Sequence, residues 1–132
     1  MEILIRGVPI AKKRPRFVRR GKFVGAYNCQ ETEEGRWILE AKGQVTTCFE
    51  GPVIMLCDFV MPIPKSLRKR DVALAEAGQY YHTKKPDLDN LIKFVKDCLN
   101  GLAWRDDSQV IKLNAVKRYG RDPMTAIDLH GV

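Results

Sequence analysis

The chain contains no apolar run that approaches the roughly 20 residues needed by a membrane-spanning helix. Its first residues, "MEILIRGVPI", also lack the basic and then apolar order of a secretory signal. The four cysteines include no Cys-x-x-Cys pair, and the two histidines, His82 and His130, show no pattern that indicates a zinc site or a catalytic role. We therefore expect a soluble, cytoplasmic protein whose metal, if it binds one, is a hard ion held by oxygen atoms.

Without an export signal, a disulfide scaffold is also not expected. We predict that Cys29, Cys48, Cys57 and Cys98 are reduced thiols that act as small buried hydrophobic residues. The 132 residues suit a single domain, 1–132, with one hydrophobic core.

Positive charge is what the chain has in excess. Lysine and arginine number 23 against 16 aspartate and glutamate residues, a formal net charge of +7. This balance indicates a polyanionic partner, although by itself it does not choose between DNA, RNA and an anionic membrane. Seven basic residues lie in one short segment, 12–22, and we expect them to form either a solvated loop or a phosphate-binding surface: Lys12, Lys13, Arg14, Arg16, Arg19, Arg20 and Lys22.

Hydrophobic periodicity and turn residues predict an α+β fold with one mixed β-sheet and packed helices, because the order is not a regular alternation of strand and helix. The expected strands are 2–8, two hairpin strands around a turn at 19–22, 53–62, 109–119 and 124–130, and the expected helices are 29–46, 66–77 and 89–100. Asn28 and Glu31 are spaced as a capping box for the first helix. The segment 62–86 is expected to be a long basic excursion.

Four aspartates surround the third predicted helix, in the stretch "KKPDLDNLIKFVKDCLNGLAWRDDSQV". Pro86 disfavours helix just before it, so Asp87 is expected in an extended lead-in and Asp89 at or near the helix N-cap, where both carboxylates can converge. The helix covers about 17 Å. The seven residues 101–107 can span at most about 23 Å, so Asp106 or Asp107 could return to the same end.

Three carboxylates in a basic protein make an all-oxygen site of the kind that Mg²⁺ or Mn²⁺ occupies. Lys93 lies one turn beyond Asp89 and could contact the scissile phosphate. Spacing alone leaves plainer alternatives open: Asp-x-Asp is common at helix starts, Asp106-Asp107-Ser108 is ordinary turn material, and Lys93 could be a solvated residue or an ion-pair partner of Asp89.

The same stretch resembles the signature of the RusA-type Holliday-junction resolvases, in which D-x-D-N-L-x-K is followed by D-x-L, a glycine, an aromatic residue and D-D-x-Q-V. "GVPIAKKRPRF" and "KRYG" are similar to the family's opening and penultimate strands. The chain departs from some members at Pro86, where they have arginine, and has Lys84 and Lys85 just upstream. The segment 62–83 is a weak match, and it is where substrate preference could be set.

The resemblance implies a RusA-like homodimeric endonuclease that nicks four-way DNA junctions symmetrically with Mg²⁺ or Mn²⁺, in recombination and repair, in a bacterial, nucleoid-associated or prophage setting. The implied metal ligands are Asp87, Asp89 and Asp107, and Lys93 is the implied catalytic lysine. Asp106 is a supporting carboxylate or a turn residue. A nuclease of the same fold that acts on other branched or single-stranded DNA, or a non-catalytic DNA-binding module, remains an alternative.

With a DNA partner implied, the segment 12–22 together with Lys84 and Lys85 becomes the predicted DNA-binding surface. Tyr80 and Tyr81 are expected to pack on the core, with stacking on bases as the alternative. Phe94 and Trp104 are expected in the core or in a dimer interface.

Overall fold

The elements follow one another in the order that the sequence predicts. The computed structural model describes residues 1–27 and 29–132, and for Val18, Arg20, Phe23, Ala26 and Tyr27 it describes the backbone only. The elements are β1 (Glu2–Arg6), β2 (Arg16–Arg20), β3 (Phe23–Tyr27), α1 (Glu31–Lys42), β4 (Val53–Pro62), α2 (Lys69–Glu76), α3 (Leu88–Leu99), the short 3-10 helix η1 (Asp107–Gln109), β5 (Val110–Gly120) and β6 (Met124–Gly131).

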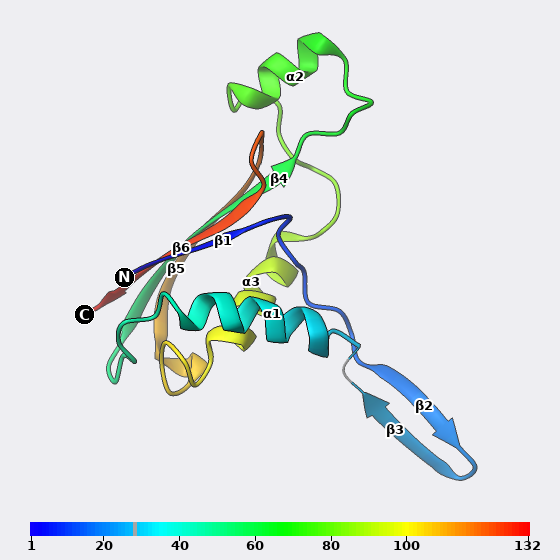
Figure 1. The fold of residues 1–132 in the computed structure, drawn as a ribbon, viewed down its shortest axis with the longest axis vertical. Helices are drawn as coiled ribbons and strands as arrows, with labels where there is room; N and C mark the ends of the chain where they lie inside the picture. The colour runs from blue at the N-terminus through cyan, green and yellow to red at the C-terminus, as the bar shows by residue number, and fades with distance from the viewer. Residues whose placement is uncertain (28) are drawn as a thin grey trace.

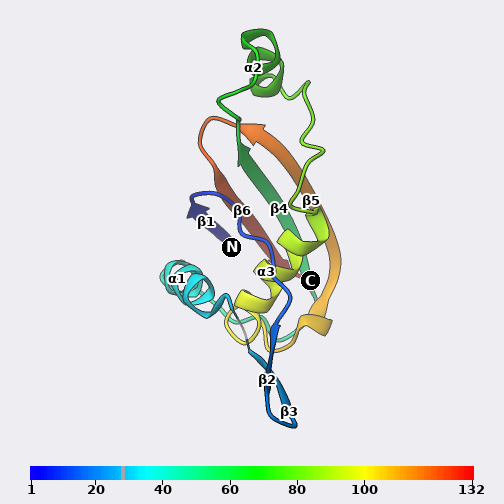
Figure 2. The same cartoon turned by 90° about the vertical axis from the view of Figure 1, so that its right-hand side faces the viewer.

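Four of the strands form a mixed sheet in the order β1-β6-β4-β5. β4 pairs in parallel with β5, whereas β6 is antiparallel to both β4 and β1. α1 and α3 lie side by side against one face of this sheet, and β2 and β3 form a separate hairpin that projects from it (Figures 1 and 2). The predicted single α+β domain with a mixed sheet and packed helices is confirmed.

The core lies between the sheet and the two helices. β4 turns alternate side chains inward, as expected for a strand with one buried face, and α3 buries an apolar stripe against them. The ring edge of Trp37, in α1, packs on Phe94, in α3, with 6.0 Å between ring centroids. Phe94 and Trp104 are fully buried, so their prediction as core residues is confirmed.

The first helix is shorter than predicted. It ends at Lys42 rather than near residue 46, because Gln44 is used elsewhere: its side-chain amide donates to the carbonyl of Leu4 and accepts from the amide of Leu4, both at 2.8 Å. These bonds satisfy the open edge of β1. The N-cap is Gln30, without a side-chain capping bond, and the capping box predicted on Asn28 lies outside the described residues.

All four cysteines are free thiols, and they differ in burial. Burial raises the pKa of Cys57 and of Cys98 to about 12, so both match the prediction of buried hydrophobic residues. Cys29 is half-buried and Cys48 is exposed, and for these two the prediction is wrong because they lie in the connections on either side of α1 and not on a core-facing position.

The excursion between β4 and α3 carries α2 away from the sheet (Figure 1). Gly78, with a φ of 76°, follows the helix. The rings of Tyr80 and His82 then pack on Tyr119 of β5, at centroid distances of 5.9 and 4.7 Å. Tyr80 therefore packs on the core as predicted, whereas Tyr81 is exposed and does not.

Burial and nearby Lys117 lower the pKa of His82. Among the described residues, no helix is long and apolar enough to cross a membrane.

Candidate active site

The first two aspartates of the motif lie at the N-terminal end of α3. Asp87 is the N-cap residue, with extended backbone angles (φ −69°, ψ 144°), and Asp89 is in the first turn. The cap is therefore two residues earlier than Asp89, while the extended lead-in predicted for Asp87 is confirmed. Asp87 makes no side-chain capping bond within the described part of the chain, and both carboxylates are exposed. Helix capping by its side chain therefore does not account for an aspartate at position 87.

Lys117 of β5 holds the lead-in to this helix. Its Nζ donates to the carbonyls of Lys84 and Pro86, at 2.8 and 2.9 Å, across a cis peptide bond between Lys85 and Pro86. The Pro86 carbonyl immediately precedes Asp87, so Lys117 orients the backbone from which the Asp87 side chain extends. Sequence reasoning missed this contact because Lys117 is 30 residues away from Asp87 in the chain.

Lys93 extends from α3 one turn after Asp89. Its side chain is 62% exposed, and its Nζ lies 3.6 Å from Oδ2 of Asp97, one turn further along the helix. The structure therefore pairs Lys93 with Asp97 rather than with Asp89. Such an exposed pair contributes about 0–1 kcal/mol, so the ammonium can leave it at little cost.

Asp106 and Asp107 lie in a tightly bonded turn before β5. The indole Nε1 of buried Trp104 donates to Oδ1 of Asp107 at 3.0 Å. Asp106 caps η1: its carboxylate accepts from the amide and the hydroxyl of Ser108, and Gln109 completes a capping box. The bonds from Ser108 lower the pKa of Asp106. Asp106 is therefore a turn residue, which is one of the two roles predicted for it; the other was a supporting carboxylate.

The turn lies at the opposite end of α3 from Asp87. The amide of Gly101 donates to the carbonyl of Trp104 at 2.7 Å, directly after the helix ends. The strand β5 begins directly after this turn, where Val110 pairs with Val53. Lys117, which bonds the lead-in at the N-terminal end of α3, lies seven residues later in β5. Seven residues correspond to about 23 Å along the strand.

The length of residues 101–107 allowed a return to the N-terminal end, but within one protomer they do not return, because Gly101 and Trp104 close a tight turn instead of an extended connection. Across the described residues, no three histidine, cysteine or acidic side chains come close enough to hold a metal ion. Asp87 and Asp89 alone still suit Mg²⁺, which commonly binds one or two carboxylates and completes its shell with water and substrate phosphate.

The basic segment is divided between structural and exposed residues. Nζ of Lys12 lies 2.8 Å from Glu34 in α1 and 3.2 Å from Asp97 in α3. Partial burial by itself lowers the pKa of Lys12, but bonds to these two carboxylates outweigh it and the pKa is raised. Lys13 lies 3.3 Å from Glu33. Lys12 in particular ties the segment to the two helices.

The other predicted DNA-binding residues have different settings. Arg14, Arg16, Arg19, Lys84 and Lys85 are exposed, and Arg20 is described by its backbone only. Lys84 and Lys85 lie in the lead-in next to Asp87.

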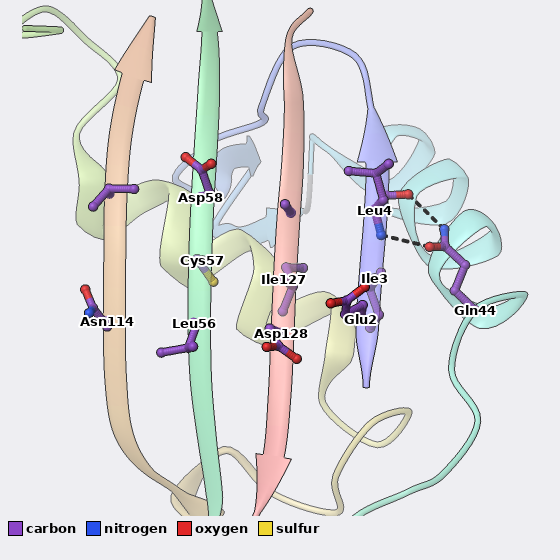
Figure 3. Close-up of a pocket in the computed structure, with 12 residues that line it drawn as sticks. Glu2, Ile3, Leu4, Gln44, Leu56, Cys57, Asp58, Asn114, Ile127 and Asp128 are labelled. Carbon is purple, nitrogen blue, oxygen red and sulfur yellow. Dashed lines mark hydrogen bonds between the residues drawn. The ribbon is translucent and has the colours of Figure 1, made fainter. Parts of the chain in front are cut away.

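A shallow hollow of about 610 Å³ lies on the sheet face away from the helices (Figure 3). Its carboxylates are largely engaged: Asp58 forms a bidentate bond to Arg118, with distances of 2.9 to 3.2 Å, and Asp128 bonds His130 at 2.8 Å. Leu4 and Leu56 make the rest of this face partly apolar. The hollow is separate from the aspartates of α3 and offers no cluster of open carboxylates to a metal.

The site thus combines exposed carboxylates at the start of α3, a lysine one turn along that helix, and exposed basic residues in the hairpin region and in the lead-in to α3. A family model described as "Endodeoxyribonuclease RusA" matches residues 6–130. The chain therefore belongs to the RusA family, and this membership implies endodeoxyribonuclease activity. The chain is also 32% identical over 141 residues to the uncharacterized protein YqaN of Bacillus subtilis (strain 168), covering 100% of this chain and 96% of that protein.

Proposed function

We propose that this protein is a metal-dependent, structure-selective endodeoxyribonuclease that resolves four-way DNA junctions by paired symmetric nicking, in DNA recombination and repair. The observation that carries the proposal is the exposed pair Asp87 and Asp89 at the start of α3, in a chain of this family. We place its action on bacterial, phage or prophage DNA in the cytoplasm, at the nucleoid.

Asp87 and Asp89 would hold Mg²⁺ or Mn²⁺, with Asp107 as a third ligand. When bound, the metal supplies Lewis-acid activation of a water molecule and neutralises charge on the phosphate. Lys93, which is mostly exposed and only weakly paired with Asp97, would turn to the scissile phosphate and stabilise the negative charge that develops as the bond breaks.

The position of Asp107 supports a homodimer. In one protomer Asp107 lies beyond the C-terminal end of α3, about a helix length from Asp87 and Asp89, or roughly 18 Å. A two-fold axis that sets two α3 helices antiparallel would bring Asp107 of the partner subunit to the carboxylate pair of the first. This arrangement creates two equivalent sites, which suits a junction with two-fold symmetry.

The exposed basic residues near these sites would bind the DNA backbone. Lys84 and Lys85 lie just before Pro86 and Asp87 and are well placed to bind phosphates close to the cut. Arg14, Arg16, Arg19 and Arg20 would bind phosphates further along an arm. Lys12 has a mainly structural part in this proposal, since two carboxylates already neutralise it.

The test compares the wild-type protein with Asp87→Asn on a synthetic four-way junction and on a linear duplex of equal length, each with Mg²⁺ and with EDTA. We expect paired symmetric nicks on the junction only, with Mg²⁺ only, and binding without cutting by Asp87→Asn. If the protein cuts flaps or single strands in preference to the junction, its substrate is another branched DNA or a single-stranded DNA. Binding without cutting under any divalent ion would mean a non-catalytic module.

A further inference from the structure

The hairpin of β2 and β3 extends away from the sheet and its helices in both views (Figures 1 and 2). Its two strands pair only with each other as a two-stranded sheet, and the turn at Gly21, with a φ of 61°, connects them. A hairpin in this position contributes little to the core of its own protomer. Its exposed side chains are therefore available to a partner.

One face of the hairpin is apolar and exposed. Phe17 is 77% exposed and Val24 is 59% exposed. Arg19 pairs directly with Val24 across the strands, and Phe17 is two residues before Arg19 on the same face. Phe17 and Val24 are thus diagonal neighbours, about 7 Å apart. We call Phe17 and Val24 the apolar face of the hairpin.

The charge around this face specifies the kind of partner. No aspartate or glutamate occurs from Lys12 to Gln30, so the hairpin attracts polyanions. Arginine and lysine are enough to bind phosphates, so the exposed phenylalanine and valine are not explained by phosphate binding. The planar faces of nucleobases are the part of DNA that an exposed aromatic ring binds, and each stacked base contributes about 1–3 kcal/mol. In a continuous duplex these faces are covered by neighbouring base pairs, whereas a branch point whose arms are unstacked uncovers the faces of the base pairs that flank it.

The segment that leads into the hairpin, residues 11–13, is hydrogen-bonded to Gln30 and to α3, the helix that begins at Asp87 and Asp89. The Gln30 side chain accepts from the amide of Lys13 at 2.6 Å and donates to the carbonyl of Ala11 at 2.7 Å. The Lys12 amide donates to the carbonyl of Asn90, in the first turn of α3, at 2.9 Å. A contact made by the hairpin is thereby linked to the position of Asp87 and Asp89.

We propose that the apolar face of the hairpin stacks on bases uncovered at a branch point, and that this contact distinguishes branched from linear DNA. Phe17 is the stacking residue and Arg19 binds an adjacent phosphate. Because Lys12, in the segment that leads into the hairpin, is bonded to the first turn of α3, the contact also sets the distance between the branch and the nick. The inference rests on the proposed DNA substrate, but it requires no catalysis.

The test measures binding in the Asp87→Asn background, so that no DNA is cut. A four-way junction carries 2-aminopurine at the branch, and a linear duplex carries it at a matched position. We expect Phe17→Ala to weaken junction binding about ten-fold, to leave duplex binding unchanged and to abolish the fluorescence change of the branch 2-aminopurine. Phe17→Trp should bind the junction and the duplex as the wild-type protein does and should keep the fluorescence change.

Arg19→Ala is the matched control on the same face. It should weaken the binding of junction and duplex alike and lower the salt dependence of binding by about one counterion, as expected for a lost phosphate contact. The Phe17→Ala protein should keep the wild-type salt dependence. Thermal unfolding of each variant checks that the fold is intact.

Equal weakening of junction and duplex by Phe17→Ala, or an unchanged 2-aminopurine signal, would overturn the stacking role. The result is separable from the nuclease proposal. If the wild-type protein never cuts a junction but Phe17→Ala still loses branch binding selectively, the stacking inference holds and the nuclease proposal fails. If cutting depends on Asp87 but Phe17→Ala binds branches normally, only the stacking inference fails.

Discussion

Trp104 and Asp107 form the contact that most constrains a predicted site residue. The indole is fully buried and its N–H occupies Oδ1 of Asp107, which leaves Oδ2 for another partner. A bond of this kind fixes the orientation of a carboxylate and tunes its affinity for a metal, and its loss typically costs 10–100-fold in metal affinity or activity. Trp104 would therefore be a positioning residue that acts through Asp107.

We predict that Trp104→Phe raises the Mg²⁺ or Mn²⁺ concentration needed for half-maximal junction cutting by about ten-fold or more. Trp37→Phe is the control, because Trp37 is also buried but packs on Phe94. Both substitutions shrink a buried ring and should lower the melting temperature. Metal titrations of the cutting rate, made well below both melting temperatures, separate the two effects. Identical metal requirements in the two variants would contradict the role of Trp104.

At the scale of elements, the buried side chain of Gln30, directly before α1, is one of the contacts that hold the basic segment. Gln30 is 1% exposed and bonds the backbone of Lys13 and Ala11. Gln44 makes the same pair of bonds to Leu4 at the β1 edge, but in an exposed position. Water can replace a lost bond at Gln44 more easily than at Gln30, whose bonds to Lys13 and Ala11 are partly buried and whose own side chain is buried.

We predict that Gln30→Leu lowers the free energy of unfolding by about 1–3 kcal/mol, and that Gln44→Leu lowers it by less. Chemical denaturation followed by circular dichroism measures both. The Gln30 variant should also weaken junction binding, since it releases the hairpin from the helices, whereas the Gln44 variant should bind normally. Equal destabilisation by the two substitutions would mean that burial of Gln30 is not what makes its bonds important.

At the scale of the whole molecule, the separation of Asp107 from Asp87 and Asp89 can be tested by mixing subunits. Asp87→Asn and Asp107→Asn chains are co-expressed with different tags and purified as the heterodimer. If Asp107 acts in the partner's site, one of the two sites in this heterodimer is intact. We predict that it nicks one strand of a junction, whereas either mutant homodimer cuts nothing.

The heterodimer of Asp87→Asn with Asp89→Asn is the control, since each site then carries one damaged carboxylate and nothing should be cut. An inactive heterodimer of Asp87→Asn with Asp107→Asn would place all three aspartates in one subunit. A monomeric protein that is active in solution would exclude the homodimer altogether.

Much of this architecture follows from local pattern. The mostly apolar run "VIMLCDFVMP", rich in β-branched and aromatic residues, places β4 at 53–62 as predicted. The apolar spacing of Leu91, Val95 and Leu99 defines the buried face of α3. Glycines with positive φ end or turn elements where the sequence indicates, at Gly21, Gly78 and Gly101. Such features depend on neighbours within a few residues, so a single sequence contains the necessary information.

The relations across the sheet could not be read in this way. Two sets of contacts join residues that are far apart in the chain. Lys117 bonds the carbonyls of Lys84 and Pro86, and Lys12 pairs with Glu34 and Asp97. The length of residues 101–107 permitted Asp107 to lie at either end of α3, because chain length limits reach but not direction.

By itself, the sequence determined the order of the elements, the α+β class, the basic hairpin and the aspartate motif that marks the family. Only the tertiary structure decided where the members of that motif lie: Asp87 and Asp89 at one end of α3, and Asp107 at the other, bonded to Trp104. The physical reason is that local propensity sets where a helix or turn begins, whereas packing of the buried Trp104 beside Phe49 and Asn100 sets the direction in which the chain leaves the helix.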